Sequence, residues 1–373
     1  MNQQIYFEKD IVSLTDEVNR LCPKTILVVT GSSSYEASGA KSLIDELFGE
    51  YNLLFFSDFS VNPKLEELEN GIAKLQDIEL DLIVAIGGGS VIDMAKLIRC
   101  YVGHHIVLTG SVKANRVPHE QKVPFIAIPT TAGSGSESTH FAVVYVEGSK
   151  YSVSHPTILP NYVLLIPSLT YGNPPYLTAC SGADALCQAI ESYWSVQSTE
   201  ESRDFARQAI PLLWQHLPQA IKNNSEARNK VMFAANMAGR AINTSFTTAA
   251  HAYSYGLTTY AGVPHGHAVS LTLPYFFDLN MKVVQDNCND VRGEGFVRER
   301  MGELLHFFNC TEKTAIEVLS SFFQGIFGEK NDEAKNRITD YIQKQVASSV
   351  NLQRLQNNPV KVTKEDLENI KFQ

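Results

Sequence analysis

The sequence predicts an α/β domain with a doubly wound parallel sheet over residues 1–170, followed by an all-helical domain over residues 171–373. Before residue 170, short apolar runs alternate with amphipathic helical segments, which is typical of parallel α/β sheets. After it, helical periodicity continues without strand-like runs. A chain of 373 residues also exceeds the usual size of one hydrophobic core. We expect the hinge between the domains at 167–175, which is rich in Pro, Gly and Asn.

The composition restricts the partners of this chain. Its net charge of -9 argues against binding to nucleic acid or to an anionic membrane, and no apolar run is long enough for a membrane span. Its six cysteines are scattered without CxxC spacing, and the first residues lack the pattern of a signal peptide. We therefore expect a cytoplasmic homodimer with free thiols that acts on a small molecule.

The first domain opens with a helix, because Ile11, Leu14, Val18 and Leu21 form one apolar stripe. Residues 25–30 are apolar on both faces, as in a strand inside a parallel sheet. Asn62 is predicted to cap a helix that has Pro63 at its first position. Further strands are predicted at 53–56, 82–86, 105–108, 124–128, 141–146 and 163–166.

The second domain has only helical patterns. The predicted helices are 181–194, 199–216, 226–245, 248–259, 265–282, 295–307, 311–327 and 332–347. A last short helix should follow Thr363, because Thr363 and Asp366 have the spacing of a capping box.

Two glycine-rich segments follow predicted strands. Gly87, Gly88 and Gly89 come directly after the strand at 82–86 and open a helix, so their N–H groups can approach a phosphate. The segment 129–137 follows the strand at 124–128 and contains small hydroxyl residues. A single glycine turn is a common structural device, but the two segments together predict a nucleotide site.

The helical domain contains a candidate metal site. His251 and His265 are fourteen residues apart, and Asp184 and Gln188 lie one turn apart on a single helix face. A lone helical histidine is more often a hydrogen-bonded core residue, and Asp184 alone would be interpreted as a helix cap. Glu191 is interpreted as structural. Three or four converging donors of these types nevertheless favour a divalent metal ion.

The order of these motifs resembles the iron-containing (group III) alcohol dehydrogenases. The matching segments are Gly87-Gly88-Gly89-Ser90 with Asp93 and Lys96, 129–137, Gly182-Ala183-Asp184-Ala185, His251, and Pro264-His265-Gly266. The resemblance implies a dehydroquinate synthase-like fold with an NAD(P)H-binding α/β domain, a helical domain and a metal between them, Fe²⁺ or Zn²⁺. It assigns the metal to Asp184, Gln188, His251 and His265. It assigns the cofactor to Gly31, Ser32, Gly87, Gly88, Gly89, Ser90, Asp93, Thr130, Thr131, Ser134 and Lys150.

The chain departs from this family at two positions of the site. Gln188 stands where members usually carry histidine, and an amide oxygen should bind Fe²⁺ or Zn²⁺ more weakly than imidazole does. Tyr255 stands where many members carry a second histidine, so we predict Tyr255 and His267 as the catalytic residues of proton transfer.

The residues around these motifs resemble those of the phosphonoacetaldehyde reductase (hydroxyethylphosphonate dehydrogenase) branch. A phosphonate dianion needs cationic or hydroxyl donors, and Lys150, Ser152, His155 and Arg240 are candidates. Family members that prefer NADH often have an aspartate after the first strand. This chain has Gly31 there, followed by serines 32–34, which favours NADPH.

The sequence thus predicts a metal-dependent oxidoreductase that reduces a small aldehyde with NAD(P)H, and the resemblance favours phosphonoacetaldehyde as that aldehyde. Two alternatives remain open. One is a short-chain alcohol or lactaldehyde-type dehydrogenase acting on a neutral substrate. The other is a metal-free, non-catalytic nucleotide-binding protein. Related sugar-phosphate synthases fit the spacing of Asp184, His251 and His265 less well.

Overall fold

A computed structural model describes residues 3–32, 34–104, 106–118 and 123–372. The chain forms two compact units, and the first ends at Asn173 where the second begins at Pro174. This boundary falls inside the Pro-, Gly- and Asn-rich segment 167–175.

The first unit is built on a six-stranded parallel sheet with the order β1-β8-β5-β4-β2-β3. The predicted α/β class of this unit is confirmed. Its strands are β1 (Gln4–Phe7), β2 (Thr25–Thr30), β3 (Asn52–Phe56), β4 (Leu82–Gly87), β5 (Phe125–Pro129) and β8 (Tyr162–Leu165). A separate antiparallel hairpin joins β6 (Phe141–Val146) to β7 (Ser149–Ser154).

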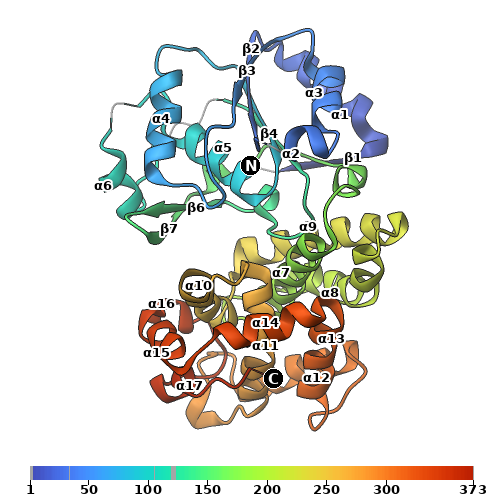
Figure 1. Ribbon diagram of the computed structural model, residues 1–373, viewed down its shortest axis with the longest axis vertical. Helices are drawn as coiled ribbons and strands as arrows, with labels where there is room; N and C mark the ends of the chain where they lie inside the picture. Colours follow the sequence, from blue (N-terminus) through green and yellow to red (C-terminus); the bar gives the residue numbers. More distant parts are fainter. Residues whose placement is uncertain (1–2, 33, 105, 119–122, 373) are drawn as a thin grey trace. The chain divides into compact units, whose positions relative to one another are not determined.

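Helices cover both faces of this sheet because the central strands are apolar on both sides. Ile26 and Val28 of β2 pack in one cluster with α1 (Ile11–Leu21) and α3 (Ala40–Phe48). Leu27 and Val29 of the same strand pack on the other face, with α4 (Leu65–Leu75), α5 (Gly89–Tyr101) and α6 (Leu108–Lys113). The short helix α2 (Ser34–Ala37) follows β2. Figure 1 shows α1 and α3 on one side of the strands and α4 and α5 on the other.

Three predictions in this unit were wrong or incomplete. The strand expected at 105–108 is not present at Leu108, where α6 begins, and His105 lies outside the described residues. Asn62 does not cap α4: it has a left-handed φ of 62°, and Lys64 is the cap residue. The strands β1 and β7 were not predicted, because β1 is a short edge strand and β7 alternates polar residues that resemble a loop.

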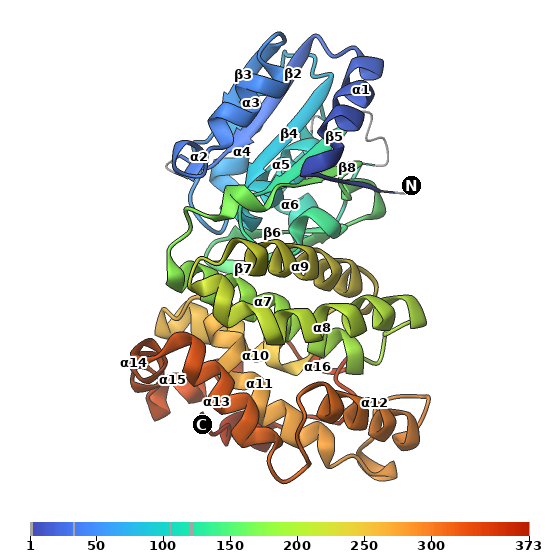
Figure 2. The ribbon, with the colours of Figure 1, turned by 90° about the vertical axis from the view of Figure 1, so that its right-hand side faces the viewer.

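The second unit is helical, as predicted. Its longer helices are α7 (Pro175–Trp194), α8 (Glu200–Ile221), α9 (Ser225–Ser245), α10 (Ala249–Ala261), α11 (His265–Met281), α12 (Glu294–Phe307), α13 (Ala315–Phe327), α14 (Glu329–Arg337) and α15 (Asp340–Ser349). Figure 2 shows α7, α8 and α9 running side by side. The predicted helix 332–347 is divided between α14 and α15, and Thr339 caps α15. The capping box of Thr363 and Asp366 is confirmed at α17 (Lys364–Glu368).

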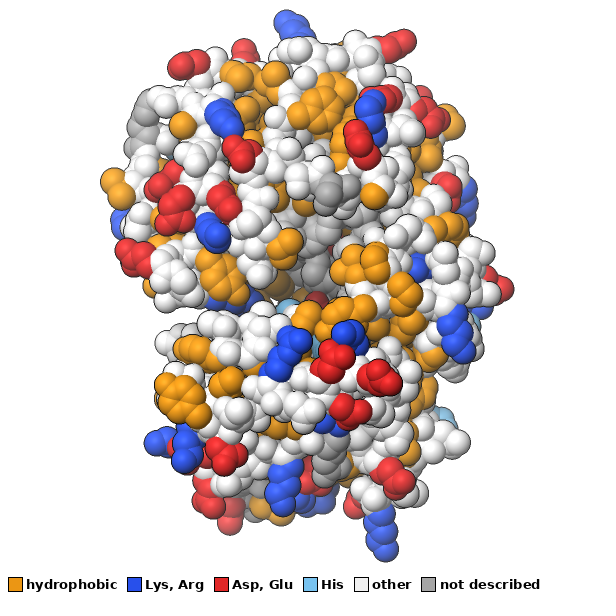
Figure 3. Space-filling view, viewed as in Figure 1, with side chains coloured by type: hydrophobic (Ala, Val, Ile, Leu, Met, Phe, Trp, Pro, Cys, Tyr) orange, Lys and Arg blue, Asp and Glu red, His pale blue; other side chains and the backbone are white. Residues whose placement is uncertain are grey.

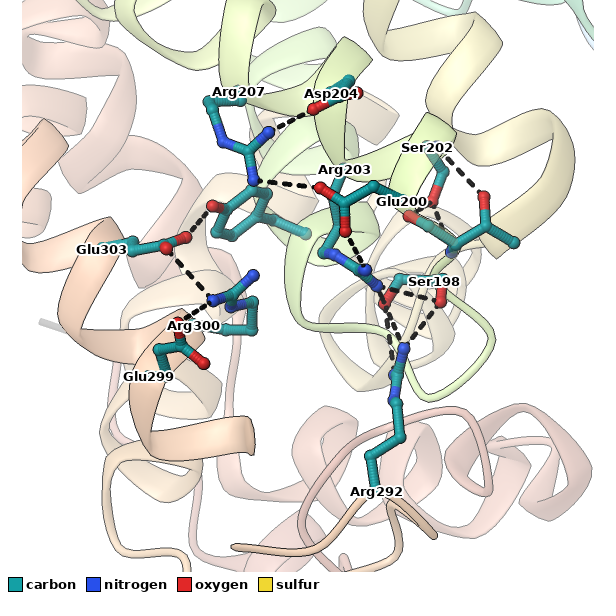
Figure 4. Close-up of polar contacts among 12 residues, drawn as sticks. Ser198, Glu200, Ser202, Arg203, Asp204, Arg207, Arg292, Glu299, Arg300 and Glu303 are labelled. Atoms are coloured by element: carbon teal, nitrogen blue, oxygen red, sulfur yellow. Dashed lines mark hydrogen bonds and ion pairs between the residues drawn. The ribbon is translucent and has the colours of Figure 1, made fainter. Parts of the chain in front are cut away.

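An arginine cluster fixes the segment between α7 and α8 to α12 (Figure 4). The Ser198 carbonyl oxygen accepts from Arg203 at 3.2 Å and from Arg292 at 2.7 Å. Both guanidinium groups lie over the Phe296 ring, with Cζ at 5.1 and 4.0 Å from its centroid. Carboxylates balance this positive charge, so the cluster is structural. On the face in Figure 3, acidic and basic side chains are likewise interspersed.

Within the described part of the chain, no helix has the length and apolar character needed to cross a membrane.

Candidate functional site

Three donor atoms from three helices converge in the helical unit. Asp184 lies on α7, His251 on α10, and His265 is the first residue of α11. The Asp184 Oδ1 atom is 3.2 Å from His251 Nε2 and 3.7 Å from His265 Nε2. All three donor atoms lie within 4.8 Å of one another, so one ion can contact all of them. The structure therefore brings together three of the four residues predicted as metal ligands.

Glycine at position 266 makes this convergence possible. A Cβ on Gly266 would overlap the carbonyl oxygen of Cys180 and would lie 2.9 Å from the Asp184 Cβ. Only a residue without a side chain lets the start of α11 approach α7 this closely. The glycine that follows His265 in the sequence is therefore a packing requirement for the site.

Glu191 holds the imidazole of His251 from the side away from Asp184. Its Oε2 atom is hydrogen-bonded to His251 Nδ1, and its Oε1 accepts from Thr248 Oγ1 at 2.7 Å and from the Thr248 N–H at 3.0 Å. A carboxylate on the second nitrogen orients a histidine ligand and makes it a stronger donor. The sequence interpretation assigned Glu191 only a structural role. Its spacing of seven residues from Asp184, two turns along one helix face, was the available signal.

The charges around His251 also fit a cation. Burial by itself would lower the pKa of His251, but the Glu191 charge and the contact with Asp184 outweigh it and raise the pKa to about 10. Two carboxylates in a buried pocket thus stabilise a positive charge at this position. In the absence of metal, the proton on His251 supplies this positive charge. A divalent ion would replace that proton.

The cluster opens toward the solvent on the side of His265. The side chain of His265 is 34% exposed, compared with 10% for Asp184 and 3% for His251. The ring of Tyr255 stacks on that of His265, with centroids 5.1 Å apart and an interplanar angle of 10°. The Tyr255 hydroxyl accepts from Nη1 of Arg354 at 3.2 Å. A ligand must therefore enter beside His265 and Tyr255.

Gln188 lies one turn after Asp184 on α7 and is buried. Its Nε2 donates to Asp184 Oδ2 at 3.2 Å, so the amide supports the carboxylate. A direct bond from Gln188 to a metal remains a prediction.

His267 does not lie with the three donors. Its Nε2 donates to Asn331 Oδ1 at 3.0 Å, because an amide oxygen can only accept. In a neutral imidazole the other nitrogen is then an acceptor, so Nδ1 accepts from the Tyr176 hydroxyl at 3.0 Å. Its ring is fully buried and stacks on Phe327 with centroids 3.8 Å apart. Burial lowers the pKa of His267. These contacts favour a structural role in which His267 joins α11 to α7, α13 and α14, and proton transfer by His267 stays a prediction.

The candidate cofactor residues gather at one edge of the parallel sheet. The chain runs from β2 outward to β3 and then crosses to β4, which pairs with β2 on its other side. Dinucleotides bind at such a switch point, beyond the carboxyl ends of the strands. Gly31 and Ser32 follow β2, and Gly87 ends β4. Ser33 lies outside the described residues.

Small residues let the two glycine-rich segments approach each other closely at this edge. Gly88 caps α5 and Gly89 begins it, and a Cβ on Gly88 would meet the side chain of Thr131 at 3.5 Å. A Cβ on Gly89 would lie 3.0 Å from that of Ser134. Thr130 continues the sheet, its N–H donating to the Gly87 carbonyl oxygen at 3.0 Å. The helix N-terminus thus presents backbone N–H groups.

Other residues predicted for this site face elsewhere. Asp93 is half-buried, and it accepts from Ser136 Oγ and from the Val143 N–H at 3.0 Å. Its carboxylate thus anchors the β6 hairpin, and a direct contact of Asp93 with the cofactor stays a prediction. The hydroxyl of Ser90 accepts from the Asn62 N–H at 3.1 Å. Lys150 lies on β7 and its charge acts on Asp93.

Lys96 and the proposed phosphonate donors also occupy other places. Lys96 is fully buried and donates to Thr139 Oγ1 at 3.0 Å and to the Phe141 carbonyl oxygen at 2.8 Å. The Arg240 guanidinium lies over the Phe205 ring, with Cζ 4.0 Å from the ring centroid. Ser152 lies on β7, and His155 follows it and caps a 3-10 turn.

The chain thus has two features of a metal-dependent dehydrogenase. The α/β unit has a glycine edge, formed by Gly31, Gly87, Gly88 and Gly89, of the kind that binds phosphate. The helical unit has a carboxylate and two imidazoles that converge. Comparison with known proteins agrees. The model of the iron-containing alcohol dehydrogenase family matches residues 2–167, and the model of the Fe-containing alcohol dehydrogenase family, C-terminal part, matches 178–371. This chain belongs to the iron-containing alcohol dehydrogenase family, whose members are oxidoreductases that use NAD(P) and a metal.

Three relatives illustrate the range of the family. Long-chain-alcohol dehydrogenase 1 of Geobacillus thermodenitrificans is 33% identical over 318 residues, which are 83% of this chain and 76% of the relative. Phosphonoacetaldehyde reductase of Streptomyces viridochromogenes is 35% identical over 246 residues, 62% of this chain and 61% of the relative. The solved structure of sulfoacetaldehyde reductase from Bifidobacterium kashiwanohense with NAD⁺ is 28% identical, has a TM-score of 0.84, and covers 98% of this chain and 95% of its own.

Proposed function

We propose that this protein reduces phosphonoacetaldehyde to 2-hydroxyethylphosphonate with NADPH, using a divalent metal held by Asp184, His251 and His265. The observation that carries the proposal is the convergence of these three donors, with Glu191 behind His251. Two relatives support the choice of substrate. One is named a phosphonoacetaldehyde reductase and the other a sulfoacetaldehyde reductase, and each of these substrates is a two-carbon aldehyde with an anionic group.

The residues of the helical unit would serve the reaction in defined ways. A bound divalent ion supplies Lewis acidity toward a carbonyl oxygen. Asp184 and the two imidazoles orient the aldehyde by fixing where its oxygen can bind, and Glu191 keeps Nε2 of His251 directed at that point. The proton that completes the alcohol comes from solvent on the open side beside His265 and Tyr255, since His267 is buried and fully hydrogen-bonded.

The α/β unit would hold the dinucleotide by its glycine edge. A nicotinamide cofactor supplies the hydride. Gly31 provides no carboxylate to accept hydrogen bonds from the adenosine ribose or to repel a 2′-phosphate, and the exposed Ser32 adds a hydroxyl donor. This favours NADPH over NADH.

Steady-state assays test the proposal. The protein is loaded with Fe²⁺ or Zn²⁺, and kcat/KM is measured for phosphonoacetaldehyde, sulfoacetaldehyde, propanal and a long-chain aldehyde with each nicotinamide. We expect phosphonoacetaldehyde with NADPH to give the highest value. Equal efficiency across the panel would favour the neutral-substrate alternative, to which the long-chain-alcohol relative points. Failure to bind either metal would favour a non-catalytic nucleotide-binding protein.

A further inference from the structure

We infer that Arg354 binds the anionic group of the substrate and is the specificity-determining residue of this site. The inference rests on the proposed function and adds a residue that the sequence motifs do not include. It identifies the substrate class as short aldehydes that carry a tetrahedral oxyanion, phosphonate or sulfonate.

Arg354 is connected to the donor cluster through one aromatic ring. Its Cζ lies 5.1 Å from the centroid of Tyr255, and its Nη1 donates to the Tyr255 hydroxyl at 3.2 Å. The same ring stacks on His265, the most exposed of the three donors. Arg354 therefore lies by the side on which the cluster opens.

The guanidinium retains hydrogen-bonding capacity. Among the described residues, its side-chain hydrogen bond to the protein is made by Nη1 alone, and no carboxylate forms an ion pair with it. The arginines of Figure 4 differ, because Arg203 and Arg300 each pair with a glutamate, Glu200 and Glu303. A partly exposed arginine with Nε and Nη2 available can donate two parallel hydrogen bonds to one oxyanion.

The segment that carries Arg354 is fixed to the site. Arg354 belongs to the short helix α16 (Leu352–Leu355), and the buried Leu355 follows it. Two residues further on, Asn357 Nδ2 donates to the carbonyl oxygens of Ser245 and Thr247 at 2.8 and 2.9 Å. Ser245 is the last residue of α9, and Thr247 lies in the link that leads to α10. Helix α10 carries both His251 and Tyr255. The segment that carries Arg354 is thus anchored next to α10, which also carries part of the site. This anchoring reduces the conformational entropy that Arg354 loses when it binds a ligand.

Electrostatics favour an anion-binding arginine here. The carboxylates of Asp184 and Glu191 balance the charge of a bound divalent ion, and the chain carries a net charge of -9, so a further cation would help to attract a dianionic substrate. If Arg354 only stacked on Tyr255, its loss would remove a partly exposed cation–π contact and would affect charged and neutral aldehydes alike. The two roles predict different kinetics.

The test compares Arg354→Gln and Arg354→Lys with wild type, using the metal-loaded full chain and NADPH. The control is Arg298→Gln, an exposed arginine of α12 that pairs with Glu294 at 3.9 Å. For Arg354→Gln we expect kcat/KM on phosphonoacetaldehyde and sulfoacetaldehyde to fall about 10- to 100-fold, mainly through KM, with propanal changed less than about twofold. Arg354→Lys should retain part of the preference, and Arg298→Gln should match wild type.

A binding readout complements the kinetics. Methylphosphonate should inhibit propanal reduction by wild type, and Arg354→Gln should weaken this inhibition about tenfold or more.

Equal losses on all three aldehydes would show a structural role and overturn the inference, as would unchanged kinetics. If wild type prefers sulfoacetaldehyde and Arg354→Gln removes that preference, the inference stands and the phosphonate function fails. If wild type prefers phosphonoacetaldehyde and Arg354→Gln keeps that preference, only the inference fails. If propanal is preferred and methylphosphonate does not inhibit, both fail.

Discussion

His251 presents one ring nitrogen to Asp184 and the other to Glu191, so its chemistry depends on two carboxylates at once. This arrangement orients the ligand nitrogen and also competes with metal, because the metal-free imidazole keeps a proton up to high pH. Metal affinity at this site is therefore a property of Glu191 as much as of the donors themselves.

Replacement of Glu191 by glutamine should weaken metal binding about 10- to 100-fold, because the amide cannot stabilise the imidazole as a carboxylate does. Titration against a competing chelator measures the change. Glu303→Gln, which alters a carboxylate on α12 bonded to Tyr193 and Arg300, is the matched control and should bind metal as wild type does. Unchanged affinity in Glu191→Gln would contradict the orienting role.

The raised pKa of His251 also predicts how the metal-free protein responds to pH. The ordinary pKa is 6.5 and the folded value is about 10, so the stabilisation from this group is complete below pH 6.5 and is lost as pH rises to 10. Urea unfolding of chelator-treated protein should show a midpoint that falls between pH 7 and 10. Glu191→Gln should reduce that slope, and an identical slope in the variant would assign the effect to other groups.

His267 should be structural. His267→Gln disrupts the bonds to Tyr176 and Asn331 in a buried place, and we expect the free energy of unfolding to fall by about 2–3 kcal/mol. The pH profile of kcat/KM should keep its shape, since the variant removes no proton donor of the reaction. Loss of one limb of that profile would restore a catalytic role for His267.

At the scale of elements, the site depends on how closely α7, α10 and α11 approach. Gly266 sets the approach of α11 to α7, and the bonds from Glu191 to Thr248 fix the start of α10 on α7. The link before α10 is strained, because Phe246 has a φ of 56° that side chains rarely adopt. Asn357 holds this link in place.

Gly266→Ala should separate α11 from α7, because the new methyl overlaps backbone that cannot rotate away. We expect a loss of at least about 2 kcal/mol of stability and no stoichiometric metal binding. Gly295→Ala on α12 is the control: nothing lies within 4 Å of its Cβ, so the change should be neutral or stabilise by about 0.5–1 kcal/mol. Calorimetry and metal analysis report both effects, and tight metal binding by Gly266→Ala would contradict the packing argument.

At the scale of the whole molecule, the two candidate sites lie in separate compact units. The three metal donors all follow Pro174, and the glycine edge lies before Asn173. Removal of metal should therefore destabilise one unit selectively.

Hydrogen exchange tests this selectivity. Saturating metal at about 1,000 times its Kd stabilises a site by about 4 kcal/mol. Chelation should increase amide exchange in α7, α10 and α11, whereas β2, β4 and β5 should exchange as before. Uniform deprotection of both units would contradict a metal confined to the helical unit.

The sequence by itself determined the class of the fold and the identities of the donors. Buried strands and long helices follow from local periodicity, and the matching segments with their glycines stand in the order of one family. The polar strand β7, the edge strand β1 and the start of α6 were missed because their stability comes from neighbours rather than from local pattern.

Only the tertiary structure decided which predicted residues act together. It bonded His267 to Tyr176 and Asn331, bonded Asp93 to the β6 hairpin, and placed Glu191 against His251 and Arg354 against Tyr255. Arg354 is about a hundred residues from Tyr255 in the sequence, and no local pattern links them. The physical reason is that side-chain roles depend on distances and burial between distant segments, which packing sets and sequence spacing alone does not specify.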